Sequence, residues 1–150
     1  MPQADFSAIP VISIAALQSG RAADIDKVAA EIAGACESAG FFYVVDHGVP
    51  AATVEDVFDA ARWFFAQPQS ARDALDVATS PNFRGYVPMG IKGPGVPRRM
   101  LEAFQIMLEL GPDDADVRAG NVMHGPNRWP PDAPAFRTAM EAYYGAVTAL

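Results

Sequence analysis

The chain has 150 residues, 51% of them hydrophobic and 19% charged, a length that allows one hydrophobic core and hardly two. Its formal net charge of −7 disfavours nucleic acid and anionic membranes as partners, because both repel an acidic surface. Its apolar runs are far shorter than the roughly 20 residues that span a bilayer, and the first residues lack a leader pattern, so we expect no membrane contact and a cytoplasmic location.

The first predicted elements are a short strand near residues 10–14 and a helix over residues 24–39. Pro10 supplies no amide hydrogen, which places this strand at its beginning or at a sheet edge. The helix has apolar residues at steps of three and four, with Asp24 as the predicted N-cap and Gly40 as the C-cap. Cys36, the single cysteine, lies on that apolar stripe, which predicts a buried and inert thiol.

A strand over residues 41–45 is predicted next, at the centre of the fold. Its side chains are apolar on both faces, so we expect it inside a sheet that is covered on both sides. Asp46, His47 and Gly48 predict a tight turn after it. An amphipathic helix over residues 51–66 follows, and a weaker helical turn is predicted within residues 69–78.

Prolines and glycines prevent any long regular element between Thr79 and Arg99, so a loop is expected there. A strand is predicted over residues 101–109, with Glu102 on an otherwise apolar face. Because an unpaired buried carboxylate costs several kcal/mol, Glu102 should have a cationic partner. The candidates are Arg84, Arg98 and Arg99.

A final helix is predicted over residues 134–150. No capping residue follows its last apolar position, so we expect the 150 residues to be the front part of a longer polypeptide. On base rates, Phe64, Phe65, Trp129, Tyr143 and Tyr144 are assigned to the core.

Common catalytic motifs are missing from the sequence: a Gly-rich phosphate loop, a Cys-X-X-Cys pair and a Gly-X-Ser-X-Gly nucleophile elbow. A two-histidine, one-carboxylate iron site needs His-X-Asp, which neither His47 nor His124 provides. Both histidines are therefore interpreted as hydrogen-bonded turn residues, and no metal ligand is predicted in this chain.

Arg84 and Tyr86 are the best candidates for a ligand site. Arginine presents a planar fork to a carboxylate, and a tyrosine beside Gly85 offers a flat wall with a polar tip. The alternative is that Arg84 pairs with Glu102 and Tyr86 packs on Phe104, without any ligand. The residues alone leave both interpretations open.

The order of these motifs resembles the amino-terminal region of the isopenicillin N synthase-like non-haem iron oxygenases, over nearly the whole chain. Each motif is modest alone, but their common order is specific. The family usually has Asn-His-Gly where this chain has Asp46-His47-Gly48. The motifs that carry the resemblance are Ile9-Pro10-Val11-Ile12-Ser13, Gly40 to Val49, Trp63-Phe64-Phe65, Arg84-Gly85-Tyr86, Glu102-Ala103-Phe104 and His124 to Pro130.

The resemblance implies a mixed α/β (α+β) fold, the flanking region of a double-stranded β-helix (jelly-roll) oxygenase whose barrel lies largely after residue 150. It implies an enzyme that uses Fe(II), 2-oxoglutarate and O2 to oxidise a small molecule, with release of succinate and CO2. The metal triad would lie in the later half, so residues 1–150 alone should be inactive.

The resemblance also implies roles for single residues. Substrate contacts are expected at Arg84, Tyr86, Met89 and Phe104, and turn or pairing roles at Gly40, Asp46, His47, Gly48 and Glu102. Arg84 suggests a substrate with a carboxylate or an amino-acid-like group, and the full-length protein is expected to be a monomer. Two alternatives stay open: a family member that oxidises without 2-oxoglutarate, and a non-catalytic binding or interaction module.

Overall fold

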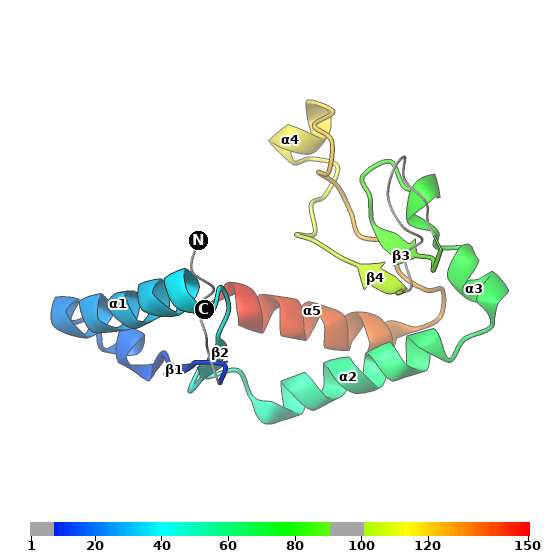
Figure 1. The fold of residues 1–150 in the computed structure, drawn as a ribbon. Helices are drawn as coiled ribbons and strands as arrows, with labels where there is room; N and C mark the ends of the chain where they lie inside the picture. The colour runs from blue at the N-terminus through cyan, green and yellow to red at the C-terminus, as the bar shows by residue number, and fades with distance from the viewer. Residues whose placement is uncertain (1–7, 91–100) are drawn as a thin grey trace. The chain divides into compact units, whose positions relative to one another are not determined.

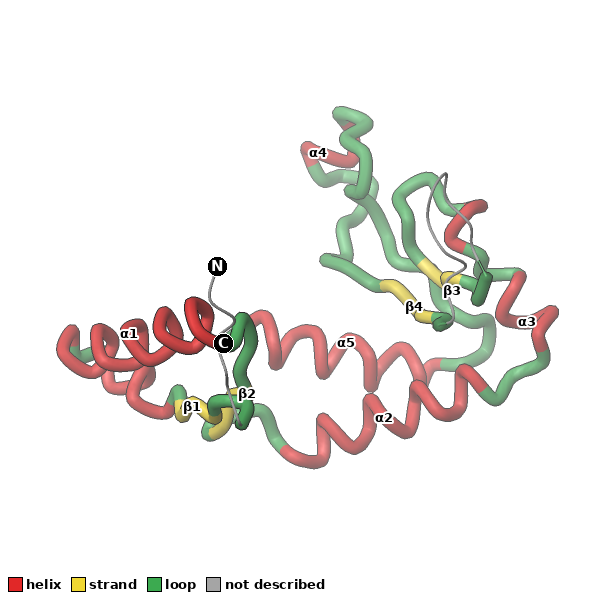
Figure 2. Tube along the Cα trace, viewed as in Figure 1, coloured by secondary structure: helices red, strands yellow, loops and turns green. Residues whose placement is uncertain are grey.

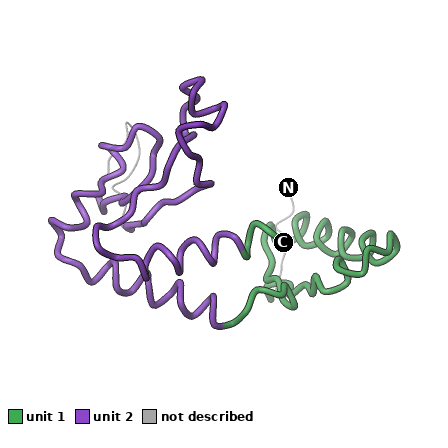
Figure 3. The backbone as a smooth tube through the Cα atoms, turned by 180° about the vertical axis from the view of Figure 1, so that it is seen from behind, with its two compact units in different colours: residues 1–51, 146–150 green, residues 52–145 purple. Residues whose placement is uncertain are grey.

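A computed structural model describes residues 8–90 and 101–150. The backbone forms two compact units, residues 1–51 with 146–150 (unit 1) and residues 52–145 (unit 2), coloured separately in Figure 3. Figures 1 and 2 show the helices and strands along the chain. Their bounds are β1 (Val11–Ser13), η1 (Ala15–Ser19), α1 (Ala22–Ser38), β2 (Tyr43–Val45), α2 (Ala51–Phe65), α3 (Gln69–Asp73), η2 (Val77–Thr79), β3 (Gly85–Val87), β4 (Ala103–Gln105), α4 (Ala115–Arg118) and α5 (Pro134–Thr148).

Unit 1 is built on β1 and β2, which pair in parallel with Val11 opposite Tyr43 and Ser13 opposite Val45. The helix α1 connects them, as a parallel pair requires a crossover. Ile12, Val28 and Ala35 form the buried core of this unit. Gly40 has a φ of +82°, and its amide donates to the Ala35 carbonyl, so a glycine turns the chain from α1 toward β2.

Three predictions for unit 1 need correction. The helix begins at Ala22 with Arg21 as N-cap, whereas Asp24 lies in the first turn, where the Ser19 hydroxyl and Arg21 lower its pKa. Cys36 is exposed, because Val28 and Ala35, seven residues apart, define the buried stripe.

The strand β2 is also not covered on both sides in the described chain. Tyr43 is 60% exposed, and Val44 and Val45 are 37% and 39% exposed. Among the described residues only β1 pairs with it. The continuous apolar run predicted the strand correctly, but the covering layers are not formed by the described residues.

In unit 2, α2 and α5 lie side by side and run in opposite directions (Figure 1). Phe64 of α2 and Phe136 of α5 are 1% and 4% exposed, with ring centroids 5.4 Å apart. The Phe104 ring of β4 lies 4.6 Å from Phe64 in an edge-to-face arrangement. This aromatic cluster supports the β3–β4 hairpin, and aromatic pairs of this kind add about 0.5–1.5 kcal/mol each beyond their area burial.

The strand β3 was not predicted, because its glycine and the surrounding prolines indicate a loop. It pairs antiparallel with β4, with Tyr86 opposite Phe104. The strand β4 has three residues, shorter than the predicted span of residues 101–109. Gly85 has a φ of +116°, and a Cβ atom there would overlap the Leu75 carbonyl oxygen, so only glycine fits.

The long helices agree with the predictions to within two residues at each end, with α2 over Ala51–Phe65 and α5 over Pro134–Thr148. The weak helical turn within residues 69–78 is divided into α3 and η2. None of the helices in the described residues is long and apolar enough to span a bilayer.

Candidate functional site

The β3–β4 hairpin of unit 2 brings together three of the four predicted substrate contacts. Arg84 and Tyr86 are each 1% exposed, and Phe104 lies directly opposite Tyr86. Met89, beyond the end of β3, is 51% exposed. Of the four predicted residues, Arg84 and Tyr86 are therefore buried, whereas Met89 is exposed.

Glu102 lies at the centre of one polar network. The Tyr86 hydroxyl donates to the Glu102 Oε2 atom at 2.6 Å, and Arg72 forms an ion pair with the same oxygen. Arg72 also donates to the Gln69 side chain at 2.8 Å, and its guanidinium lies over the Tyr86 ring at 5.4 Å. The half-buried carboxylate thus has its cationic partner.

That partner was not among the predicted candidates. The alternative without a ligand predicted that Arg84 pairs with Glu102, and this prediction was wrong. Arg98 and Arg99 lie outside the described residues. Gln69 and Arg72 were missed by the sequence reasoning. The only available signal was their three-residue spacing, which places both on one side of a helical turn.

Burial raises the pKa of the Tyr86 phenol above its usual value, and the hydrogen bond to Glu102 raises it further. The phenol is therefore neutral at physiological pH and acts as a donor. Because the Glu102 carboxyl group accepts from both Tyr86 and Arg72, the tyrosine ring is held in one orientation.

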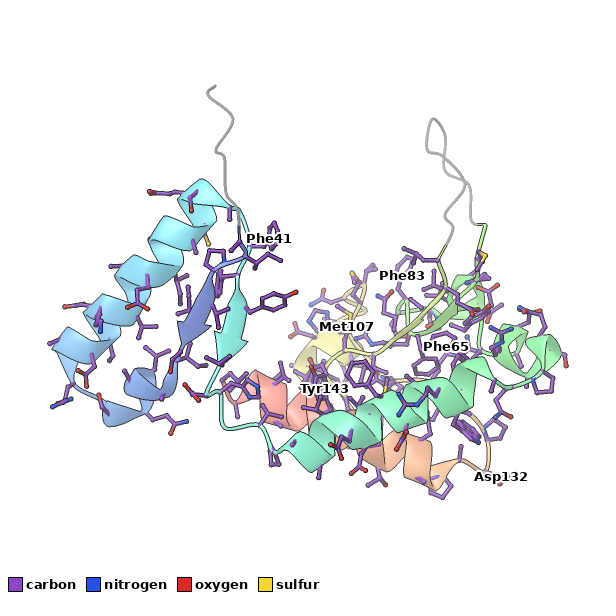
Figure 4. All side chains as sticks on the ribbon, turned by 60° about the horizontal axis from the view of Figure 1, so that its bottom comes forward. Phe41, Phe65, Phe83, Met107, Asp132 and Tyr143 are labelled. Carbon is purple, nitrogen blue, oxygen red and sulfur yellow. The ribbon has the colours of Figure 1, made fainter. Side chains whose placement is uncertain are left out.

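Arg84 forms a second, separate network with two backbone carbonyls and one side-chain sulfur. Its Nη1 atom donates to the Asn82 carbonyl at 2.7 Å and to the Met107 sulfur at 2.7 Å, and its Nη2 atom donates to the Met123 carbonyl at 2.6 Å. Figure 4 places Phe83, the residue before Arg84, and Met107 in the β3–β4 part of unit 2. The guanidinium therefore connects three segments that are distant in sequence.

The surroundings of Arg84 are unusual for a cation. Its Nε atom is buried and has no hydrogen-bond partner among the described residues. Burial lowers its pKa, although an arginine keeps its charge. Both terminal nitrogens donate to acceptors of the protein, so the hydrogen bonds of the guanidinium group are formed within the chain.

Asn127 and Arg128 were not predicted as site residues, yet both organise the hairpin. The Asn127 side chain accepts from the Met107 amide at 2.9 Å and donates to the Met107 carbonyl at 2.8 Å, as a neighbouring strand would. Arg128 donates to the carbonyls of Ala74 and Asp76 and to the Thr79 hydroxyl. Their position in an irregular, proline-rich segment gave no signal of these long-range contacts.

The predicted turn residues of unit 1 form a separate group. Asp46 and Gly48 have φ values of +54° and +77°, and the Ser13 hydroxyl donates to Asp46 at 2.6 Å. The Nδ1 atom of His47 accepts from the Val49 amide at 3.1 Å. These contacts are those of a tight turn.

No three His, Cys, Asp or Glu residues in residues 8–90 and 101–150 lie close enough together to hold a metal ion. His124 contacts the Val122 carbonyl at 3.2 Å and lies 3.9 Å from Asp116.

The family model described as "non-haem dioxygenase in morphine synthesis N-terminal" matches residues 9–132. The chain belongs to this family. Within the non-haem dioxygenase family, it is 36% identical over 149 residues to a homoarginine-6-hydroxylase of Glycine max, with 93% of this chain and 44% of that protein covered. It is 32% identical over 151 residues to the clavatol oxidase of Penicillium crustosum, with 91% of this chain and 45% of that protein covered.

The fold agrees with this assignment. The crystal structure of a putative 2OG-Fe(II) oxygenase family protein from Caulobacter crescentus matches with a TM-score of 0.73 and 26% identity, over 96% of this chain and 45% of that one. The chain thus spans less than half the length of these curated relatives. The mixed α/β fold of an amino-terminal oxygenase region is confirmed, and the family implies Fe(II) and 2-oxoglutarate as cofactors.

Proposed function

We propose that this chain is the amino-terminal, substrate-positioning part of an Fe(II)- and 2-oxoglutarate-dependent oxygenase whose catalytic jelly-roll follows residue 150. The proposal rests mainly on the family match over residues 9–132, together with a coverage of 44–45% of the relatives' lengths. The reaction would combine substrate, O2 and 2-oxoglutarate to give an oxidised substrate, succinate and CO2. One oxygen atom would enter the substrate and the other the succinate.

The role of these 150 residues would be to place the substrate. Tyr86, Met89, Phe104 and Arg84 are the proposed substrate-side residues. Met89 is the most exposed of them, whereas Tyr86 is buried and held by Glu102 and Arg72. Preorganisation of this kind favours catalysis, because a small misplacement of the substrate can cost about 100-fold in rate.

An amino-acid-like substrate is the first class to test. The homoarginine-6-hydroxylase similarity supports it, and the clavatol oxidase similarity supports an aromatic substrate as the second candidate. L-Homoarginine and clavatol are therefore the two probes. The monomeric state and the cytoplasmic location stay predictions from the sequence.

The direct experiment supplies the full-length protein with Fe(II), 2-oxoglutarate and O2, with and without each probe. We expect succinate formation in every reaction that contains 2-oxoglutarate, and a product 16 mass units heavier for a hydroxylated probe. Oxidation of a probe without succinate would instead indicate a member that does not use 2-oxoglutarate. Cooperative unfolding of residues 1–150 alone as a monomer would favour a self-contained binding module.

Replacing Arg84 with Met tests whether this residue, whose terminal nitrogens donate to acceptors within the chain, contributes to substrate binding. The KM for the probe should rise strongly while 2-oxoglutarate is still consumed without coupling to substrate oxidation. The readouts are the probe KM and the ratio of succinate to product. Unchanged substrate kinetics would remove Arg84 from the site.

A further inference from the structure

Two residues beside Arg84 have an unusual backbone conformation. Among the described residues, four that are not glycine have positive φ: Asp46, Phe83, Met123 and Asp132. Aspartate tolerates this region comparatively well, whereas Phe83 at +57° and Met123 at +71° are strained. Both are also exposed, Phe83 by 50% and Met123 by 40%.

Arg84 holds both of these residues through their local backbone. It donates to the carbonyl of Asn82, which precedes Phe83, and to the carbonyl of Met123 itself. The Ser80 hydroxyl accepts from the Arg84 amide at 2.9 Å and donates to the Asn82 side chain, which in turn donates to the Pro126 carbonyl. Buried, largely satisfied networks of this kind fix one conformation.

The conformations of Phe83 and Met123 are unfavourable for two reasons, backbone strain and the exposure of apolar side chains to water. The strained backbone conformations are each unfavourable, and the exposed apolar surface gains nothing from burial. Strain of this kind persists where the surrounding structure over-determines it, and it concentrates at ligand contacts. Nothing in the polar network needs the side chain of Phe83, because none of its hydrogen bonds uses an atom of Phe83.

We propose that Phe83 and Met123 form an apolar contact for the non-reacting part of the small-molecule substrate, and that Arg84 positions both residues. The proposal rests on the proposed oxygenase function and assigns the substrate an aliphatic or aromatic portion. The bound portion of the substrate is apolar, because Phe83 and Met123 present a phenyl ring and a thioether. The terminal nitrogens of Arg84 already donate to acceptors of the protein. Remote contacts of this kind fix the reacting carbon in position.

The decisive variant is Phe83→Asn in the full-length enzyme. Asparagine tolerates positive φ, so this change removes the ring while the backbone conformation is kept. We expect the KM for the probe that is turned over, L-homoarginine or clavatol, to rise about tenfold, with kcat within about twofold. Phe83→Leu should recover most of the loss, because an apolar side chain returns.

Phe58→Asn is the matched control, because Phe58 on α2 is 60% exposed and lies outside the site. It should leave the probe KM unchanged. An unchanged KM in Phe83→Asn overturns the proposal. So does a lowered Tm with an unchanged KM, since the ring would then pack on another part of the protein.

The positioning role of Arg84 is tested with Arg84→Lys. One ammonium group cannot reproduce the guanidinium fork that reaches both carbonyls. The probe KM should therefore rise as in Phe83→Asn, and adding Phe83→Asn to Arg84→Lys should raise it little further. Independent, multiplicative effects of the two changes would refute the coupling.

A binding measurement separates this proposal from the proposed function. In the full-length protein labelled with [methyl-13C]methionine, the Met123 methyl signal is assigned with Met123→Leu. At least one of the two probes should shift this signal in the wild type and not in Phe83→Asn. Succinate formation with an unmoved Met123 signal refutes the apolar contact alone, whereas a moved signal without any 2-oxoglutarate turnover refutes the oxygenase function alone.

Discussion

The β1–β2 pair and the β3–β4 hairpin both have strands of three residues, but they are stabilised differently. All three residues of β3 are buried, whereas all three of β2 are exposed. Side chains from two other segments bind the hairpin region through hydrogen bonds, Arg72 from one and Asn127 and Arg128 from the other. The β1–β2 pair shows one such side-chain bond among the described residues, from Ser13 to Asp46.

This difference teaches that strand length and apolar composition do not decide how firmly a strand is held. The apolar β2 has the stronger strand composition, yet β3, with a glycine at its start, is the better anchored strand. Its anchoring is polar and non-local, which is the property that the proposed substrate-positioning role would require. The predictions below compare the two regions, beginning with the largest expected effect.

Gly85→Ala should disrupt the hairpin most strongly. The added Cβ atom would overlap the Leu75 carbonyl oxygen, which also accepts from the Tyr86 amide, in a backbone with a φ of +116°. We expect a loss of more than about 3 kcal/mol in the free energy of unfolding, measured by urea denaturation. Gly20→Ala in unit 1 is the control, because Gly20 also has positive φ but open space around it, and it should cost about 1 kcal/mol.

Arg128→Met tests the hydrogen bonds that Arg128 forms with the segment before β3. The change leaves the Ala74 carbonyl without its Arg128 donor and removes one of the donors to the Asp76 carbonyl, which still accepts from Thr79, and this should cost about 2 kcal/mol of unfolding free energy. Arg62→Met removes an exposed ion pair on α2 and should change stability by less than about 0.5 kcal/mol. Equal losses in the two variants would contradict the assigned role of Arg128.

Tyr86→Phe should cost about 1 kcal/mol at neutral pH, because Glu102 loses one of its donors. The folded state raises the pKa of Tyr86, so its contribution is fully present below the ordinary value of about 10 and is lost as the pH rises through the folded-state pKa. Urea titrations from pH 7 upward should therefore show the wild type and Tyr86→Phe converging above about pH 10. A gap that widens there would contradict the direction of the shift.

Ser13→Ala should have the smallest effect. It removes the exposed hydrogen bond to Asp46 that links β1 to the turn after β2. We expect a change of less than about 0.5 kcal/mol, since water replaces the lost partner. A loss as large as that of Arg128→Met would mean that unit 1 also depends on polar side-chain contacts.

Much of the helical structure could be predicted, because the helical period is a local property of the chain. The candidate site was predicted only in part. Arg84, Tyr86, Glu102 and Phe104 were identified and do meet at one hairpin, yet the partner of Glu102 was wrong. Arg72 lies 30 residues from Glu102, and no local pattern connects such a pair.

The sequence by itself determined the helices, the turn glycines and the family. Periodicity and turn chemistry depend on residues that are close in sequence, and motif order depends on the sequence alone. Only the tertiary structure decided that β3 is a buried strand and that Ala35 and not Cys36 faces the core. It also decided that Arg84 donates hydrogen bonds to the carbonyls of Asn82, next to Phe83, and of Met123. The physical reason is that burial and hydrogen-bond partnership are set by segments distant in sequence, such as Leu75 against Gly85 and Met123 against Arg84.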